Sequence, residues 1–389
     1  MGFWYSAPNL EVKQLKLKTP IVLVLSFALL EGLTHFGNLH GDSMGYISMV
    51  HWFMGQATAE EAIVHWRGIG QGNTYDEPLL SWHGFLRPVV PALATPLAFI
   101  FGASTAIAIV NLGFLLLGTF FTYLFTARFF KNDLLGYIAG VCYASAGPTL
   151  VWGVAVQTDG PAYAMLAVMF YTLCFWSRPG VKSGIVTGVL LGLSLLVKEI
   201  TIVLAFLMLF LLLSQRTKER LTYTIVALGI AAAISLSWGL LVVGKTYLSF
   251  YGEGIRYAGG AYAGAFAYPV IFYDTITRGF HALIPFLILG FFLVEDKHLK
   301  VLVRILLAGS VLLLAWPTLP EIRFTFILFP VVIPLAAFGM DHAATILANR
   351  TWFRLFTKTQ WVGIILAGII LYTNCYYYFI HNYFRLPTV

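Results

Sequence analysis

The feature that most constrains this chain is a series of long apolar runs that recurs through the whole sequence. A helix needs about 20 apolar residues to cross a hydrocarbon layer about 30 Å thick, and most of the runs approach that length. Hydrophobic residues make up 59% of the 389 residues and charged residues only 11%, which excludes an ordinary soluble domain. We therefore predict an all-α polytopic membrane protein.

About eleven runs are predicted to span the membrane within a single transmembrane domain, residues 1–389. The predicted spans are 20–39, 104–127, 134–156, 159–176, 183–197, 200–213, 221–244, 277–294, 300–317, 322–345 and 360–380. A large first outer loop is expected at 40–103. Its short, proline-containing apolar stretch 88–101 is predicted to be a juxtamembrane helix at the outer surface. A second outer loop is predicted at 246–276.

The basic residues set the predicted orientation. Lys13, Lys16 and Lys18 precede the first span. Most of the 24 Lys and Arg residues fall in links that are predicted to lie on the same side of the membrane as these three lysines. Such a bias marks the cytoplasmic side, so the N-terminus is expected in the cytoplasm and the C-terminus outside, in a bacterial plasma (inner) membrane. The net charge of +7 follows from these links, and no nucleic acid is expected as a partner.

A charged pair interrupts one apolar run. Lys198 and Glu199 lie side by side within the stretch 185–213, whose basic flanks would face opposite sides of the membrane if it formed one helix. A hairpin instead places both flanks in the cytoplasm and the pair at the outer tip. Each arm rises only about 21 Å, so Lys198 is expected to sit below the outer surface and to meet a counter-charge or a water-filled cavity. Pairing with neighbouring Glu199 is the alternative.

Other polar residues are predicted to gather on the same outer face. They are Asp42 and Tyr46 after the first span, Asp76, Glu77 and Arg87 in the first loop, Asp159 at the start of a span, and Glu321 and Arg323 late in the chain. Capping a helix is the alternative for Asp42 and the favoured interpretation for Asp159, and solvation or surface pairing is the alternative for the remaining charged residues. No cofactor is firmly implied, because neither the His nor the Cys residues show metal-ligand spacing, and a divalent metal lacks a clear motif.

The order of these motifs resembles that of the multispan glycosyltransferases of the GT-C superfamily, which include protein O-mannosyltransferases and the aminoarabinose transferase of lipid A. "GDSMGY" at Asp42 is similar to the acidic motif that opens their first outer loop, and "LRPVVP" at Arg87 to the start of their surface helix. "LLVKEI" at Lys198 resembles their hairpin tip, and "EIRFTFILFP" at Arg323 their Arg-aromatic element. The chain departs from the family in its single acid at Asp42, where members have a pair.

The resemblance implies a membrane glycosyltransferase that moves a sugar from a polyprenyl-phosphate donor to a protein, lipid or glycan acceptor on the outer face, with inversion. It implies Asp42 as the catalytic base. It also implies that Lys198, Arg87 and Arg323 bind the donor phosphate and stabilise the charge that grows on it. The candidate substrate-binding residues are Asp159, Asp76, Glu77, Glu321 and Tyr46.

Two other functions stay open at this point. A secondary transporter would use Glu31 and Asp341, the ionisable residues within spans, although transporters place such groups near the midplane between related halves. A catalytically silent relative, acting as a subunit of a larger membrane complex, is favoured if Asp42 and Lys198 lie far apart.

Overall fold

The computed structural model describes residues 19–37, 39, 43–59, 61, 83–176, 179–214, 217–244, 280–315, 327–350 and 355–376, and the regular structure within these ranges is helical. The helices are α1 (Thr19–Thr34), α2 (Ser43–Phe53), α4 (Val89–Phe101), α5 (Ala103–Phe130), α6 (Asp133–Ser145), α7 (Gly147–Trp152), α8 (Asp159–Tyr171), α9 (Val181–Val197), α10 (Val203–Ser214), α11 (Lys218–Trp238), α15 (Ile284–Leu293), α16 (Asp296–Ala315), α17 (Phe329–Asn349) and α18 (Lys358–Tyr376). Single turns η2 (His83–Leu86) and η4 (Glu199–Ile202) are 3₁₀-helical, whereas η3 (Thr172–Trp176) and η5 (Gly239–Val243) are π-helical.

The expectation of a helical membrane protein is confirmed. Three helical segments are long and apolar enough to cross a membrane by length and composition, namely Ala103–Phe130, Lys218–Val243 and Phe329–Asn349. Large apolar side chains such as Leu241 and Phe292 are 84% and 78% exposed, as expected where helices face lipid. Each of the eleven apolar runs contains at least one helix, but the number of spans stays a prediction.

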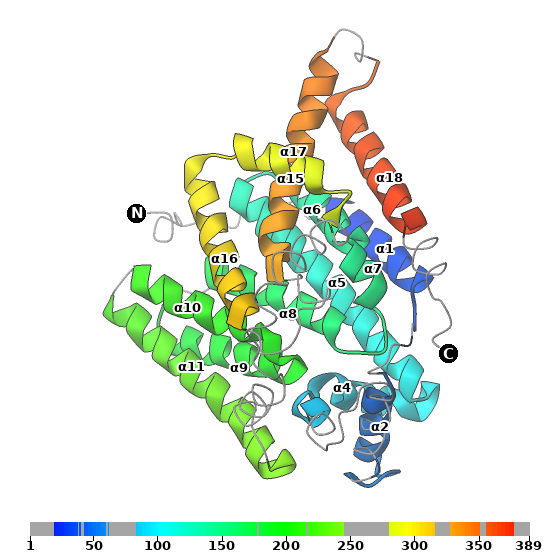
Figure 1. Ribbon diagram of the computed structural model, residues 1–389, viewed down its shortest axis with the longest axis vertical. Coiled ribbons are helices and arrows are strands. Elements are labelled where there is room, and N and C mark those ends of the chain that lie inside the picture. Colours follow the sequence, from blue (N-terminus) through cyan, green and yellow to red (C-terminus); the bar gives the residue numbers. More distant parts are fainter. Residues whose placement is uncertain are drawn as a thin grey trace.

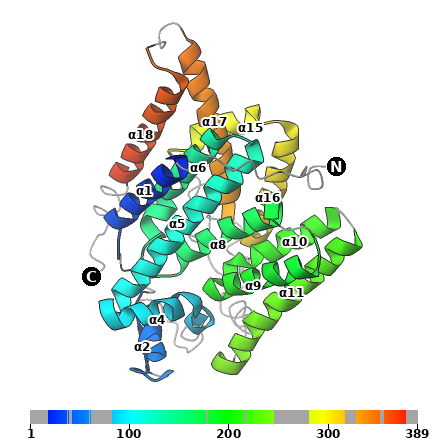
Figure 2. The same cartoon turned by 180° about the vertical axis from the view of Figure 1, so that it is seen from behind.

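Helix α8 forms the centre of the molecule. Every one of its residues is buried, and it packs against α5 and α9. Figures 1 and 2 show α8 in the middle from both sides, with α2 and α4 at one end and the hairpin of α17 and α18 at the opposite end. A helix that is apolar all round and buried all round belongs to the core, so the first residue of α8 is carried deep into the protein.

Glycines allow the helix pair α9 and α11 to pack closely. Gly184, Gly188 and Gly192 lie along the face of α9 that meets α11, and a Cβ atom on Gly188 would come within 2.7 Å of the carbonyl oxygen of Ala227. This contact holds the whole length of α9 against α11. The C-terminal end of α9, where Lys198 follows, is therefore fixed in place by a close helix–helix interface.

The apolar run 134–156, predicted as a span, does not form one continuous helix. Helix α6 ends at Ser145, α7 is a short helix, and residues 153–158 are not helical before α8 begins. Pro148 at the start of α7 has no N–H group, which interrupts the hydrogen bonding of α6. Asn111 of α5 donates its side-chain N–H groups to the carbonyl oxygens of Ala155 and Gln157, which satisfies backbone groups that a helix would otherwise satisfy.

The short helix predicted at 88–101 is confirmed as α4. Val90, Ala94 and Ala98 lie on its buried face, whereas Phe99 and Ile100 are 67% and 75% exposed. Its position at the outer surface stays a prediction. The N-terminal lysines and the second outer loop at 246–276 lie outside the described residues.

Candidate functional site

The hairpin tip between α9 and α10 contains the charged pair that interrupts the apolar run. Helix α9 ends at Val197, Lys198 has extended backbone angles, and Glu199 begins the turn η4. The helix therefore breaks at Lys198, as the hairpin prediction requires. Both side chains are buried, with exposed fractions of 1% and 4%. Two adjacent ionised groups can stay buried only if each finds a counter-charge.

Glu199 pairs with Arg87, the residue that precedes α4 by one proline. The Nε atom of Arg87 donates to Oε2 of Glu199 at 2.7 Å, and Nη2 donates to Oε1. The Nη1 atom of Arg87 donates to the hydroxyl of Tyr46 in α2 at 3.0 Å. A two-point contact of this kind fixes the plane of the guanidinium group as well as its position.

Lys198 forms a hydrogen-bonded ion pair with Asp159, the first residue of α8. The ammonium group donates to Oδ1 of Asp159, which is itself 1% exposed. The expectation of a counter-charge for Lys198 is confirmed, whereas Glu199, the alternative partner, forms its hydrogen-bonded pair with Arg87. Thr158, next to Asp159, shares a 2.9 Å hydrogen bond with the hydroxyl of Tyr46, which leads back to Arg87.

These contacts close a ring that joins four separate parts of the chain. We call it the ion-pair ring, and its members are Tyr46, Arg87, Thr158, Asp159, Lys198 and Glu199. In the ionised state it holds two positive and two negative side chains, so their charges cancel. Because all members are buried, removal of any one charge would leave its partner uncompensated at a cost of about 3–5 kcal/mol.

The connection from α7 to α8 delivers Thr158 and Asp159 to this ring. Asn111 of α5 is fully buried and holds the connection through Gln157, whose carbonyl oxygen accepts at 2.7 Å. The side-chain amide of Gln157 is also buried, and neither its nitrogen nor its oxygen has a hydrogen-bond partner among the described residues. The ring is thus supported from α5 by backbone contacts that are independent of the ionic groups.

The structure brings together four of the predicted site residues, namely Arg87, Lys198, Asp159 and Tyr46. The others lie outside the described residues: Asp42, Asp76, Glu77, Glu321 and Arg323. Sequence reasoning did not assign Glu199 or Thr158 a place in the site. The charge of Glu199 within an apolar run was the available signal for the first, whereas Thr158 has no signal beyond its position before Asp159.

The two transporter candidates lie in pairs apart from the ring. Glu31 of α1 accepts a 3.0 Å hydrogen bond from the Asn374 side chain in α18. Asp341 of α17 pairs with Lys358 at the start of α18, with both carboxylate oxygens within 2.8 Å of the ammonium nitrogen. Each pair thus attaches α18 to a neighbouring helix. Within the described ranges, no group of three or more His, Cys, Asp or Glu residues is arranged to hold a metal ion.

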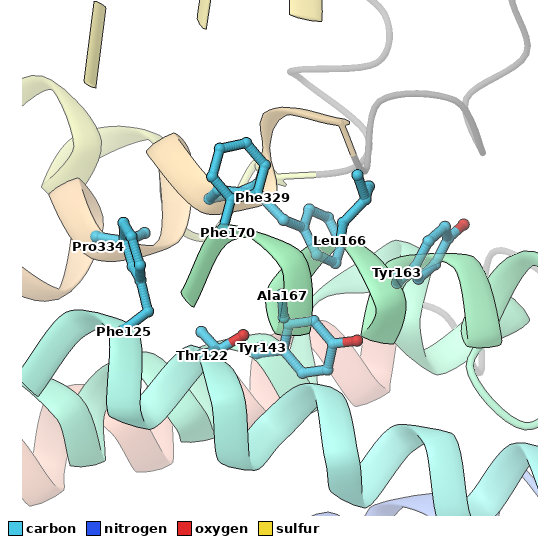
Figure 3. Close-up of a pocket in the computed structure, with 10 residues that line it drawn as sticks. Thr122, Phe125, Tyr143, Tyr163, Leu166, Ala167, Phe170, Phe329 and Pro334 are labelled. Carbon is cyan, nitrogen blue, oxygen red and sulfur yellow. The ribbon is translucent and has the colours of Figure 1, made fainter. Parts of the chain in front are cut away.

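A small cavity, with room for about one water molecule, lies between α5, α6, α8 and α17. Figure 3 shows its wall, which is formed mainly by aromatic and aliphatic side chains with three hydroxyl groups, those of Thr122, Tyr143 and Tyr163. Tyr163 follows Asp159 by four residues, which is about one turn of α8. The cavity therefore begins about one helical turn along α8 from the ion-pair ring.

Residues 82–238 match the family model described as dolichyl-phosphate-mannose-protein mannosyltransferase. Every member of the ion-pair ring except Tyr46 falls within the matched stretch. No curated protein matches the chain. The family match confirms the resemblance to the GT-C superfamily that the order of motifs indicated.

Proposed function

We propose that this protein, a membrane glycosyltransferase of the GT-C type by its family match, transfers a sugar from a polyprenyl-phosphate donor to an acceptor at the outer face of the membrane, with inversion. One observation supports this proposal more than any other. Two cations, Lys198 and Arg87, come from separate parts of the matched stretch and are joined in a single buried ring. Buried cations held in fixed positions suit the recognition of a phosphate group.

The donor phosphate would accept hydrogen bonds from the N–H groups of Arg87 that do not take part in the ion-pair ring. A guanidinium group has five N–H groups, and Glu199 and Tyr46 engage three of those on Arg87. Two N–H groups remain, one on each terminal nitrogen, with no partner among the described residues. The ammonium group of Lys198, which donates to Asp159, is proposed to attract the phosphate through its positive charge. Arg323 is proposed as a third cation.

The reaction would begin at Asp42, which directly precedes α2 in the sequence. Its carboxylate takes the proton from the acceptor as the acceptor oxygen attacks the anomeric carbon of the sugar. The bond between that carbon and the phosphate oxygen breaks at the same time, and its electron pair stays on the phosphate. The cations then stabilise the additional negative charge of the leaving group. Attack opposite the leaving group gives inversion.

The remaining predicted residues are proposed to bind substrate from around this centre. They are Asp159, Asp76, Glu77, Glu321 and Tyr46. The donor's polyprenyl tail would lie in the lipid while its phosphate reaches the cations. We propose a bacterial plasma membrane as the location, with the N-terminus in the cytoplasm and the C-terminus outside, because basic residues dominate the links on one side.

Turnover of a labelled donor tests this function. The purified protein is reconstituted with dolichyl-phosphate mannose radiolabelled in the sugar and with membrane extract as a source of acceptor. We expect Asp42→Asn to abolish transfer while leaving donor binding intact, because it removes the proton acceptor alone. Lys198→Ala should weaken donor binding by about tenfold or more, as expected for the loss of a charged hydrogen bond.

Two controls make the result interpretable. Lys297→Ala removes an exposed lysine that pairs with Glu295 between α15 and α16 and should transfer sugar like the wild type. The double variant Lys198→Met with Asp159→Asn removes both charges of one pair, so neither is left buried alone, and it should also lose donor binding. Wild-type rates in both Asp42→Asn and Lys198→Ala would refute the assigned roles. Failure of the unmodified protein itself to transfer sugar would instead favour a catalytically silent relative.

A further inference from the structure

The balanced charge of the ion-pair ring has a consequence for the product of the reaction. A sugar-linked lipid phosphate is a diester with one negative charge. The lipid phosphate that remains after transfer is a monoester, and it carries between one and two negative charges at neutral pH. A site with two uncompensated buried cations would hold this product more tightly than the donor, and slow release would then limit turnover.

Glu199 is placed to prevent such tight binding. Its two oxygens occupy two nitrogens of Arg87, so a phosphate that accepts from the remaining N–H groups would lie at another edge of the same planar group, close to a fixed negative charge. The carboxylate carbon of Glu199 and the phosphorus atom would be about 6–7 Å apart, because the guanidinium group of Arg87 and one hydrogen bond to each anion separate them. Repulsion over that distance, at the effective dielectric constant of a protein interior, weakens phosphate binding by roughly ten- to a hundredfold.

Phosphate would not simply replace Glu199. The carboxylate is bidentate, 4% exposed and anchored in the turn η4, which is itself fixed by the α9–α10 hairpin. A single phosphate oxygen competing for one nitrogen would have to break both contacts and leave a buried carboxylate without its cation. Phosphate is therefore added beside the Arg87–Glu199 pair, and the repulsion persists while it is bound.

We propose that Glu199 is a positioning residue that acts through Arg87: it fixes the guanidinium group and lowers the affinity of the site for lipid phosphate, so that the leaving group departs after transfer. This inference rests on the proposed function, because it assumes that the phosphate binds at Arg87 and Lys198. It extends that function by assigning a step, product release, to a side chain that does not itself touch the substrate.

The test compares two substitutions that separate charge from shape. Glu199→Gln keeps the size of the side chain and removes the charge, whereas Glu199→Asp keeps the charge and shortens the side chain. The probe is geranyl phosphate, a short isoprenyl monoester, and its Kd is measured by titration of the detergent-solubilised protein. We expect Glu199→Gln to bind geranyl phosphate at least about tenfold more tightly than the wild type. Glu199→Asp should stay within about threefold of the wild type.

Turnover of radiolabelled dolichyl-phosphate mannose supplies the second readout. For Glu199→Gln we expect kcat and the donor KM to fall together, because the product leaves more slowly from a site that binds more tightly. Structural damage would lower the active fraction and reduce kcat without lowering KM. Asp341→Asn is the matched control, since it removes a carboxylate from the Lys358 pair at the α17–α18 end of the molecule (Figure 1). It should leave the geranyl phosphate Kd unchanged.

Each outcome decides the proposal. Equal or weaker binding of geranyl phosphate by Glu199→Gln, with the wild type binding normally, overturns the role of Glu199 and leaves the proposed function standing. If the wild type neither binds geranyl phosphate nor turns over the labelled donor, the proposed function fails and the inference with it. If Glu199→Gln does not fold, Asp159→Asn replaces it: this variant removes the other carboxylate of the ring and should also bind the probe more tightly, and unchanged binding would contradict charge balance.

Discussion

At the scale of single residues, the sequence predicted that Lys198 has a counter-charge but did not identify the residue that provides it. A lysine within an apolar run must find a counter-charge, and Lys198 has one. Its hydrogen-bonded partner Asp159 is 39 positions away, so proximity in sequence, which points to Glu199, does not identify it. The extended backbone at Lys198 directs the two side chains toward different partners. Only the three-dimensional arrangement of α8 and the segment before α4 identifies them.

Tyr46 offers a residue-level test of the ring. Its hydroxyl accepts from Arg87 and shares a hydrogen bond with Thr158, so Tyr46→Phe leaves a buried guanidinium N–H without that partner. We expect the free energy of unfolding to fall by about 1–3 kcal/mol. Unfolding of the detergent-solubilised protein by heat measures this loss. Tyr372→Phe is the control, because Tyr372 is 51% exposed on α18, and a loss of equal size there would argue against a special role for the Tyr46 hydroxyl.

At the scale of helices, hydropathy predicted where the helices lie, but of the breaks at the hairpin tip and at 146–158 it predicted only the first. The hairpin tip was predictable because a charged pair and two basic flanks surround it. The break at 146–158 was missed, since the residues on either side of Gly147 and Pro148 are as apolar as a span. The irregular connection is stabilised from another helix, by Asn111, and no local pattern reveals such a distant contact.

The close packing of α9 on α11 makes a prediction at this scale. Gly188→Ala would place a Cβ atom 2.7 Å from the backbone oxygen of Ala227, so the helices must separate. Although alanine favours helix formation over glycine by about 1 kcal/mol, overpacking costs about 1–3 kcal/mol, and we expect a lower unfolding temperature. Movement of α9 should also displace Lys198 and reduce geranyl phosphate binding.

Gly229→Ala on α11 is the matched substitution for this experiment. Apart from its chain neighbours and the backbone of its own helix, no atom of the described residues lies within 4 Å of the Cβ position at Gly229. The same chemical change should therefore leave both stability and probe binding unchanged or raise stability slightly. Equal effects of the two substitutions would show that helix propensity, and not the α9–α11 contact, determines the outcome.

At the scale of the whole molecule, the fold and the site differ in how far a sequence can predict them. Long apolar runs suffice for a helical membrane protein, because every run must form a helix in lipid. The ion-pair ring instead depends on α2, the segment before α4, the start of α8 and the α9–α10 tip meeting at one place beside the central helix (Figure 2). The order of motifs predicted that these segments share a site, and four of the predicted residues do meet there.

The central claim is that this ring binds a lipid-linked phosphate, and native mass spectrometry of the purified protein tests it most directly. The wild type should retain a polyprenyl phosphate or its sugar ester from the membrane. The double variant Lys198→Met with Asp159→Asn should have lost it while remaining folded. Bulk phospholipids alone on the wild type, or the same polyprenyl lipid on both proteins, would contradict the account.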